Sequence, residues 1–406
     1  MTRTSTLGGD TVSGASGRAW LFGAAALVAA GFSLRPPITG LGAALEFVPV
    51  SAGIDSAVVG WVVTMPLWCY AVGGILTPRL AATWDPARAF AVALMIMAVG
   101  QVVRVTGGAG LLVAGTTVTA LATAVVATLL PVLAGRSVHG AARLTALYAP
   151  AIGVGSAAGA FLTTPVSAAG SWRWGLGLWA GVCGVAVLLW LYALRRNPDP
   201  GLVAGPAAPR SPSLRWSVVP RGRLSWSLVV LFAAWATTAF GVMSLLPSFY
   251  HEAGIDPATA GLLLGIAAAA GLPAATLFPG WVRRAHGPGR DLPLVAATVI
   301  PAVGLLGLYR FPDTVPWLWA AAIGVGLGTL SLILTLIPLR APDPGSVTVL
   351  SATTHGVGYA LAGVGVATQS ALYVWSGSWG PVIWLLSALC LVQLVAGMAV
   401  PRSRRE

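Results

Sequence analysis

The most conspicuous shortage in this 406-residue sequence is charge, because only 8% of its residues are Asp, Glu, Lys or Arg and none is Lys. Soluble domains carry about 25% charged residues, so this chain cannot cover the surface of a water-soluble fold. The shortage excludes soluble globular, disordered, coiled-coil and collagen-like proteins. Hydrophobic residues make up 57% of the chain, and its mean hydropathy of +0.84 indicates an integral membrane protein.

Cysteine is also scarce. The three cysteines, Cys69, Cys183 and Cys390, lie in apolar runs and lack the spacing of a disulfide framework or a zinc site. The sequence has no nucleotide-binding loop of the Walker type, no cluster of metal ligands and no hydrolase nucleophile elbow. We therefore expect neither an enzyme nor a bound metal or cofactor.

Long runs without Asp, Glu or Arg predict the membrane spans, since a bilayer-crossing helix needs about 20 mostly apolar residues. The last run is long enough for two helices, separated by a turn at 375–381. The sequence therefore predicts an all-α integral membrane protein with twelve transmembrane helices. The runs are 19–34, 56–78, 89–103, 105–135, 144–172, 174–194, 224–251, 257–282, 292–309, 314–339 and 344–401.

The longest interval between spans is rich in Pro and Arg and predicts a cytoplasmic linker at 196–223. It separates two six-helix bundles, 18–195 and 224–401, and leaves short cytoplasmic tails at 1–17 and 402–406. By this topology 19 of the 23 arginines fall on the side that holds both termini. The positive-inside rule assigns that side to the cytoplasm, across an inner membrane. The net charge of +12 thus follows from topology and does not indicate binding of nucleic acid.

Short repeats relate the two bundles. Ala52-Gly-Ile-Asp-Ser-Ala-Val-Val-Gly60 is echoed 201 residues later by Ala253-Gly-Ile-Asp-Pro-Ala-Thr-Ala-Gly261, and each copy follows the first span of its bundle. Asp256 in the second copy is a natural helix N-cap, and Pro257 suits the first helical position. The repeats predict two pseudo-symmetric bundles, which is the arrangement of major facilitator transporters.

The first predicted span contains Leu34-Arg-Pro-Pro-Ile-Thr39. This stretch resembles the Leu-Arg-Pro-x-x-Thr signature of the cyanate and 2-nitroimidazole transporter branch of the major facilitator superfamily. Further stretches resemble the same branch: 98–104, 246–254, 323–328 and 355–358. The resemblance implies the major facilitator fold and a secondary transporter that works by alternating access on a cyanate-like anion or a nitro-heterocycle. We expect a monomer in the lipid bilayer, with protons as a candidate coupling ion.

Arg35 is the strongest candidate for substrate binding, because the charge-free run before it is too short to span a membrane without it. A cation inside a membrane is costly unless it is paired or faces a cavity. Thr39 follows one turn later on the same helix face, and the two side chains together suit a small anion. The alternative is a structural Arg35 that pairs with Glu46 or with a helix end.

His355 is expected near mid-membrane in the eleventh span, opposite Arg35, where imidazole can donate to a ligand or carry a proton. The alternative is a neutral histidine hydrogen-bonded between helices. Trp68, Tyr148 and Trp235 are candidates for stacking on a planar substrate, because they lie in spans that line the cavity in the superfamily. Their alternative role is ordinary helix packing.

Four residues near the outer ends of spans are candidates for gating or coupling: Glu46, Arg104, Tyr250 and Glu252. A solvated rim is the alternative for the two carboxylates. For Arg104 the sequence favours an interfacial side chain that extends toward the headgroups. No Asp or Glu falls securely in mid-membrane, which argues against a simple carboxylate-based proton site.

Two other functions remain compatible with the sequence. One is an efflux antiporter for drugs or metabolites, although the fifth span lacks the Gly-Pro pair of the superfamily's drug/proton antiporters. The other is a non-transporting membrane sensor that kept the fold. The short linker, which has no recognisable output domain, argues against a sensor.

Overall fold

The computed structural model describes residues 10–48, 56–135, 141–196, 222–284, 289, 291–341 and 344–401, and within these ranges the regular structure is helical. The first half contains α1 (Asp10–Ser33), α2 (Pro36–Ala44), η1 (Leu45–Phe47), α3 (Ser56–Thr83), α4 (Pro86–Val103), α5 (Ala109–Gly135), α6 (Ala141–Ala169) and α7 (Trp172–Arg196). The second half contains α8 (Arg223–Glu252), α9 (Pro257–Arg284), α10 (Leu292–Arg310), α11 (Pro316–Val325), η4 (Gly326–Gly328), α12 (Thr329–Arg340), α13 (Pro344–Ser376) and α14 (Gly380–Met398).

The described helices account for the predicted spans. Eleven segments are long and apolar enough to cross a bilayer, and α3 adds a twelfth through its shorter apolar stretch Val58–Gly74. The first span consists of α1 and α2 together, and the tenth consists of α11, η4 and α12. The prediction of twelve transmembrane helices is therefore confirmed.

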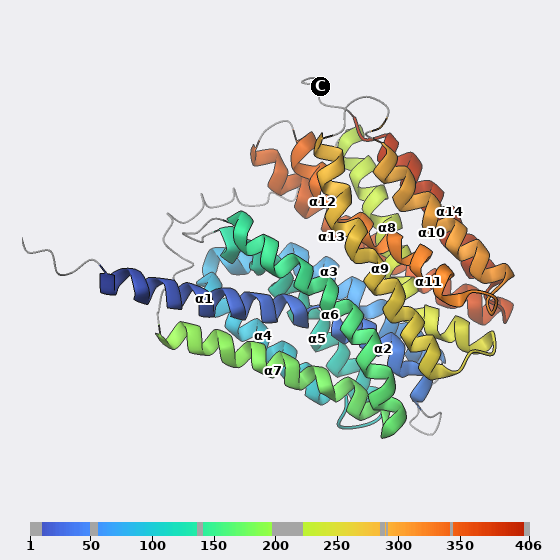
Figure 1. Ribbon diagram of the computed structural model, residues 1–406, viewed down its shortest axis with the longest axis horizontal. Helices are drawn as coiled ribbons and strands as arrows, with labels where there is room; N and C mark the ends of the chain where they lie inside the picture. Colours follow the sequence, from blue (N-terminus) through green and yellow to red (C-terminus); the bar gives the residue numbers. More distant parts are fainter. Residues whose placement is uncertain are drawn as a thin grey trace, which may run out of the picture.

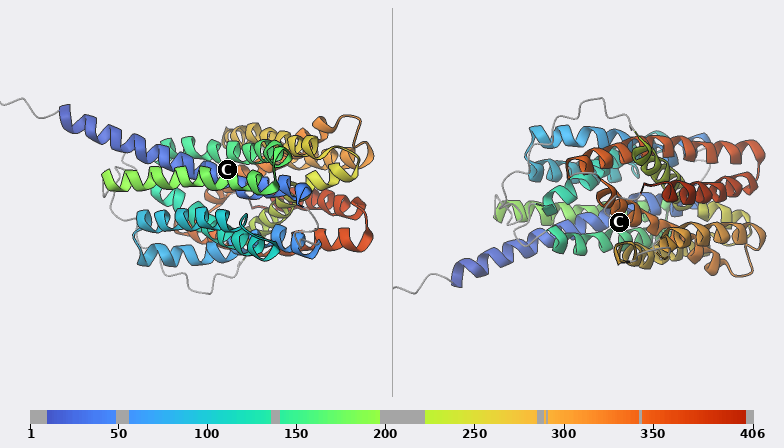
Figure 2. Two further views of the ribbon diagram at one scale, coloured as in Figure 1. Left: turned by 90° about the horizontal axis from the view of Figure 1, so that it is seen from below. Right: turned by 90° about the horizontal axis from the view of Figure 1, so that it is seen from above.

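The ends of the chain are described only in part, so the predicted tails stay predictions. Helix α1 begins at Asp10, inside the segment 1–17 that was expected to be a polar tail, and Figure 2 shows this helix projecting beyond its neighbours. The predicted linker lies almost wholly outside the described residues, as does the tail 402–406. The N-cap prediction at Asp256 holds, because its carboxylate accepts a hydrogen bond of 3.0 Å from the backbone N–H of Thr259.

The helices form two bundles, coloured blue to green and yellow to red in Figure 1. Within the first, α4 and α3 pack on α5, and α1 packs on α6 and α7. Within the second, α13 and α14 pack on α8, and α9 and α10 pack on α11. The bundles diverge toward the ends that carry the described start of α1 and the C-terminus, and they meet at the opposite ends (Figure 1).

Two exchanged helix pairs make the principal contact between bundles. Helix α3 of the first bundle packs on α13 of the second, and α6 of the first bundle packs on α9 of the second. In each pair, the second span of one bundle meets the fifth span of the other. This exchange is what a pseudo-twofold axis between two six-helix repeats produces. It supports the internal duplication inferred from the short repeats.

Glycines allow these pairs to approach closely. Gly60 on α3 lies beside Ser370 on α13, and a Cβ at Gly261 on α9 would overlap the side chain of Thr164 on α6. Small residues at helix crossings are typical of membrane proteins, because packing rather than the hydrophobic effect drives helix association in lipid.

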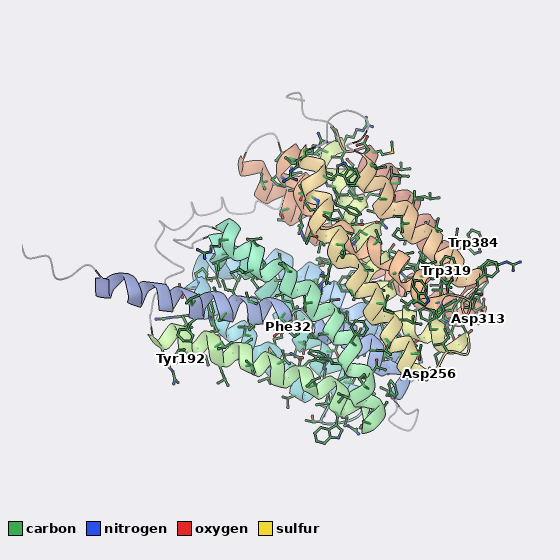
Figure 3. The ribbon with its side chains drawn as sticks, in the orientation of Figure 1. Phe32, Tyr192, Asp256, Asp313, Trp319 and Trp384 are labelled. Atoms are coloured by element: carbon green, nitrogen blue, oxygen red, sulfur yellow. The ribbon has the colours of Figure 1, made fainter. Side chains whose placement is uncertain are left out.

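Acidic side chains mark the end of the molecule remote from the termini. Asp256 and Asp313 lie together at that end of the second bundle (Figure 3), and Glu252 ends α8 there. Arg88, Arg143, Arg195, Arg223, Arg284 and Arg340 stand near the opposite ends of their helices. The separation of charge is partial among the described residues, because Asp85 and Asp291 lie at the arginine-rich end and Arg173 and Arg310 lie at the other.

Candidate functional site

The first span is broken where Pro36 and Pro37 lack backbone N–H groups. The carbonyls of Phe32 and Ser33 lose their helical donors there, and α1 ends at Ser33. The carbonyl of Arg35 accepts from the N–H groups of Ile38 and Thr39 at 3.0 and 3.1 Å, so Arg35 is the N-cap residue of α2. Arg35 therefore lies in the break between α1 and α2, and its side chain extends toward α8 of the second bundle.

The guanidinium of Arg35 lies over the ring of Phe240 on α8, with 5.7 Å between its Cζ and the ring centroid. Tyr70 on α3 and Tyr359 on α13 lie close enough to interact with it electrostatically. Within the described part of the chain, this half-buried guanidinium makes no hydrogen bond and no ion pair. Contact with an aromatic face offsets only part of the cost of holding a cation inside a membrane.

A connected group of rings extends from this cation, and we name the cation and these rings together the Arg35 cluster. Its centroid distances are 5.9 Å between Tyr70 and Phe240, 5.3 Å between Tyr70 and Tyr359, and 6.1 Å between Phe240 and Tyr359. The cluster joins both bundles, because Arg35 and Tyr70 belong to the first and its other members to the second. Its members are Arg35, Tyr70, Phe232, Trp235, Phe240, His355 and Tyr359.

His355 occupies one side of the Arg35 cluster. Its ring centroid lies 4.8 Å from that of Phe232 and 6.2 Å from that of Tyr359, one turn later on α13. Its Nδ1 lies 2.8 Å from the carbonyl oxygen of Ser351. A carbonyl oxygen only accepts, so this contact puts the proton of the neutral ring on Nδ1 and leaves Nε2 as an acceptor with no hydrogen-bond partner among the described residues.

Four polar groups of the Arg35 cluster have no hydrogen-bond partner among the described residues: the guanidinium of Arg35, the hydroxyls of Tyr70 and Tyr359, and Nε2 of His355. They come from both bundles and from the middle of their spans. Polar groups inside a membrane protein are normally satisfied. Such a gathering of unpaired groups is suited to a ligand that supplies acceptors.

Two predicted binding residues lie outside this gathering. The hydroxyl of Thr39 turns back to the carbonyl of Arg35 at 3.3 Å, and its side chain fills the space beside Gly159 on α6. The indole of Trp68 lies against Gly363 on α13 and is 37% exposed. Trp68 and Tyr70 are about 200° apart around α3, so only one of them can face the cluster.

The other predicted aromatic residues have separate surroundings. Trp235 belongs to the Arg35 cluster, where its ring lies 5.4 Å from that of Phe232, but its indole N–H already donates to the carbonyl of Gly326 at 3.2 Å. Tyr148 packs in the internal core of the first bundle, together with Leu27 and Trp190. The structure therefore brings Trp235 to the cluster and leaves Tyr148 apart from it.

The expectation of an interfacial Arg104 is wrong. Its side chain is 0% exposed, and it donates from Nη1 to the carbonyl of Pro37 at 2.9 Å and from Nη2 to that of Leu176 on α7 at 3.2 Å. A Cβ at Gly115 on α5 would lie 2.4 Å from the backbone nitrogen of Arg104. Tertiary packing encloses the residue so closely that its side chain cannot reach the headgroups.

The comparisons with known proteins agree with this architecture. Residues 21–363 match the model of the family described as Major Facilitator Superfamily. The chain belongs to the major facilitator superfamily. The superfamily is one of membrane transporters, so this chain is a multi-pass membrane protein of the transporter class.

Curated relatives of this superfamily member are transporters. The chain is 27% identical to the uncharacterized transporter YycB of Bacillus subtilis, with 92% of each chain covered. It is 26% identical to the 2-nitroimidazole transporter of Escherichia coli, with 92% and 93% covered, and 27% identical to the cyanate transport protein CynX of the same species, with 91% and 94% covered. The resemblance inferred from Leu34–Thr39 is therefore confirmed.

Solved structures share the fold. The nucleoside transporter NupG superposes with a TM-score of 0.70 at 14% identity, covering 93% of this chain and 99% of that one. A D-xylose–proton symporter superposes with a TM-score of 0.66 at 15% identity, covering 94% and 99%. At such identities the likeness establishes the major facilitator fold alone.

The gating candidates of this superfamily member are bound within single bundles. The hydroxyl of Tyr250 donates to the carbonyl of Pro316 at 2.9 Å. Oε2 of Glu252 accepts from the hydroxyl of Tyr373 at 2.7 Å and from the indole N–H of Trp379 at 2.8 Å. These bonds join α8 to α11, α13 and α14 of the same bundle. Glu46 lies in η1, and its side chain is outside the described residues.

Sequence reasoning missed Tyr70, Phe232, Phe240 and Tyr359. One signal was available, since Tyr359 stands four residues after His355 and so shares its helix face. Phe232 and Phe240 are eight residues apart and also share a face of α8. The packing of α13 on α8 and on α3 brings these two faces together beside Arg35.

Proposed function

We propose that this chain is a secondary active transporter for a small anionic or planar polar solute, of the cyanate or nitro-heterocycle kind. It moves this solute across the inner membrane by alternating access. Both termini lie in the cytoplasm, as the arginine distribution indicates. The two E. coli relatives, whose names give cyanate and 2-nitroimidazole as substrates, support this substrate class.

The unpartnered groups of the Arg35 cluster carry the proposal. A guanidinium and two phenol hydroxyls supply donors, and the imidazole adds one when its Nε2 is protonated, whereas the described carboxylates lie at helix ends or in loops. Such a set favours a ligand with acceptors and negative charge, because a guanidinium fork binds planar anions most strongly. The faces of Phe240, Tyr70 and Tyr359 suit a flat ligand.

The arrangement of the bundles supports alternating access. They diverge toward the terminal ends and meet at the other ends (Figure 1). With the termini in the cytoplasm this is the inward-open state, and rocking about α3–α13 and α6–α9 gives the outward-open state. Because the Arg35 cluster draws on both bundles, a ligand bound there couples their movement.

The test is exchange of radiolabelled cyanate and radiolabelled 2-nitroimidazole in proteoliposomes. We expect counterflow in the wild type and at least a hundredfold loss in both Arg35→Gln and Arg35→Ala, because the cation is removed. Arg173→Gln, whose exposed guanidinium donates to the carbonyl of Gly107, is the matched control and should exchange normally. Normal exchange by both Arg35 variants at normal abundance would contradict the proposal.

The concentration of aromatic rings at the Arg35 cluster favours drug or metabolite efflux as the second candidate. Flat apolar compounds bind to such rings without needing a cation. Resistance to such compounds upon overexpression, undiminished in Arg35→Ala, would favour efflux over transport of an anion.

A further inference from the structure

One nitrogen of His355 is free to titrate. Nδ1 is committed to the carbonyl of Ser351 at 2.8 Å, one turn earlier on α13. Nε2 has no hydrogen-bond partner within the described ranges. Gain or loss of a proton at Nε2 therefore leaves the ring anchored and changes only the charge that it presents to the Arg35 cluster.

The groups that face this histidine are few. Its ring contacts Phe232 of α8 and Tyr359 of α13. Tyr359 in turn contacts Tyr70 of α3 and Phe240 of α8, and Arg35 lies over Phe240. The thiol of Cys69 on α3 is directed to the carbonyl of Thr117 on α5.

Two further helices touch α13. From α12 and α14 come mainly apolar residues such as Leu336 and Ala396. Arg340 stands at the end of α12, in a cavity it shares with Asp291, and Cys390 of α14 packs in a separate apolar cluster. Every carboxylate whose side chain the structure describes lies at a helix end or in a loop. Arg35, which lies over Phe240 beyond Tyr359, is the charged side chain of the cluster, and protonated His355 finds no described carboxylate there to act as a counterion.

We propose that His355 is the proton carrier of the transport cycle, and that it takes up a proton at Nε2 when an anion occupies the site beside Arg35. The inference rests on the proposed function, because it requires an anionic substrate. A second positive charge in the Arg35 cluster is opposed by repulsion from Arg35 in a medium of low dielectric constant, and an anion bound in the cluster cancels this repulsion.

The coupling is reciprocal. If the anion favours protonation of His355, protonation favours the anion by the same factor. The proton comes from water on one side of the membrane and returns to water on the other, so one proton crosses with each anion. No other bond is made or broken, and no oxidant or reductant is involved.

The first experiment drives radiolabelled cyanate into proteoliposomes with a pH gradient that is acidic on the side of uptake. We expect wild-type accumulation to rise about tenfold for each pH unit of gradient, which is the thermodynamic limit for one proton per anion. In His355→Gln, whose amide can donate but cannot titrate, the gradient should produce no accumulation. Exchange by this variant, whatever its rate, should be equal at about pH 6 and about pH 8.

His251→Gln is the matched control, because His251 is exposed at the end of α8 and remote from the Arg35 cluster. It should accumulate cyanate as the wild type does. Gradient-driven accumulation that persists in His355→Gln would overturn the proposal.

A second measurement needs no variant. Calorimetric titration of purified wild type with cyanate, in two buffers of different ionisation enthalpy, should show uptake of about one proton per anion bound near neutral pH. Binding without proton uptake would overturn His355 as the carrier while leaving the proposed function intact. A wild type that neither binds nor exchanges cyanate or 2-nitroimidazole would contradict the proposed function and, with it, this inference.

Discussion

Arg35 and Arg104 stand in the same bundle, each after a charge-free run shorter than a full span, and their environments are opposite. Arg104 is fully enclosed and donates to two backbone carbonyls, one of them on Pro37 at the helix break. Arg35 is half-buried and faces the second bundle. Its guanidinium contacts the ring of Phe240 and makes no hydrogen bond or ion pair within the described residues.

The difference separates two tasks. Arg104 uses Nη1 and Nη2 within the fold, and its buried Nε has no partner among the described residues. An arginine held in this way contributes to stability and position, whereas one with no hydrogen bond has its donors available for a ligand. Arg104 holds α2 through Pro37, two residues after Arg35. We therefore expect Arg104 to position the break that presents Arg35, and the following changes test this division of roles.

The largest effect is expected from Arg104→Ala. The change removes two charge-assisted hydrogen bonds and leaves a cavity among α2, α4 and α7, which should lower the free energy of unfolding by about 3 kcal/mol. Arg35→Ala should lower it by less than about 1 kcal/mol, because only a cation–π contact is lost. Denaturation of both purified variants in detergent measures the difference, and equal values would show that the two arginines do not differ in role.

Gly115→Ala should come next. The added Cβ would overlap the backbone of Arg104 and the carbonyl of Gly100, which lies 2.6 Å from its ideal position. Overpacking against backbone typically costs about 2 kcal/mol. Gly110→Ala, on the same helix but with nothing within 4 Å of the added Cβ, is the control. A loss of stability as large at Gly110 would rule out enclosure of Arg104 as the cause.

Tyr70→Phe and Tyr359→Phe test the unpaired groups around Arg35. Each keeps its ring contacts and loses a hydroxyl that the fold leaves free, so we expect KM for the transported anion to rise about tenfold without loss of stability. Tyr250→Phe should instead affect stability and not KM, because the hydroxyl of Tyr250 donates to the carbonyl of Pro316 within the fold. It should lower the free energy of unfolding by about 1 kcal/mol and leave KM unchanged.

The smallest effect concerns Asp256, which is far from both arginines. Hydrogen bonds from the side chain and backbone of Thr259 lower the pKa of this exposed N-cap carboxyl below its ordinary value. A lowered pKa stabilises the folded state above the pKa of the unfolded chain, and this stabilisation is lost as the pH falls through the folded-state value. Asp256→Ala should therefore lower the thermal midpoint at neutral pH, and the difference from wild type should shrink below about pH 4. A difference that does not change with pH would mean that the charge contributes nothing.

Much of the fold follows from the sequence. Apolar runs of sufficient length predict helices because every backbone polar group in lipid must be satisfied within its own segment. Arg35 is recognisable because the charge-free run before it is too short to span the membrane without it. These inferences need only chain length, charge and backbone chemistry.

The environment of each side chain was decided by tertiary structure. Sequence could not distinguish the enclosed Arg104 from an interfacial one, because Pro37 and Leu176 are 67 and 72 residues away along the chain. Nor could it choose Tyr70 over Trp68, since both lie on the same apolar helix and only the packing of α3 on α13 selects the face. The sequence by itself determined which segments enter the membrane and which charge is left there. Contacts between the two bundles decided which rings surround that charge, because they depend on crossing helices rather than on any local pattern.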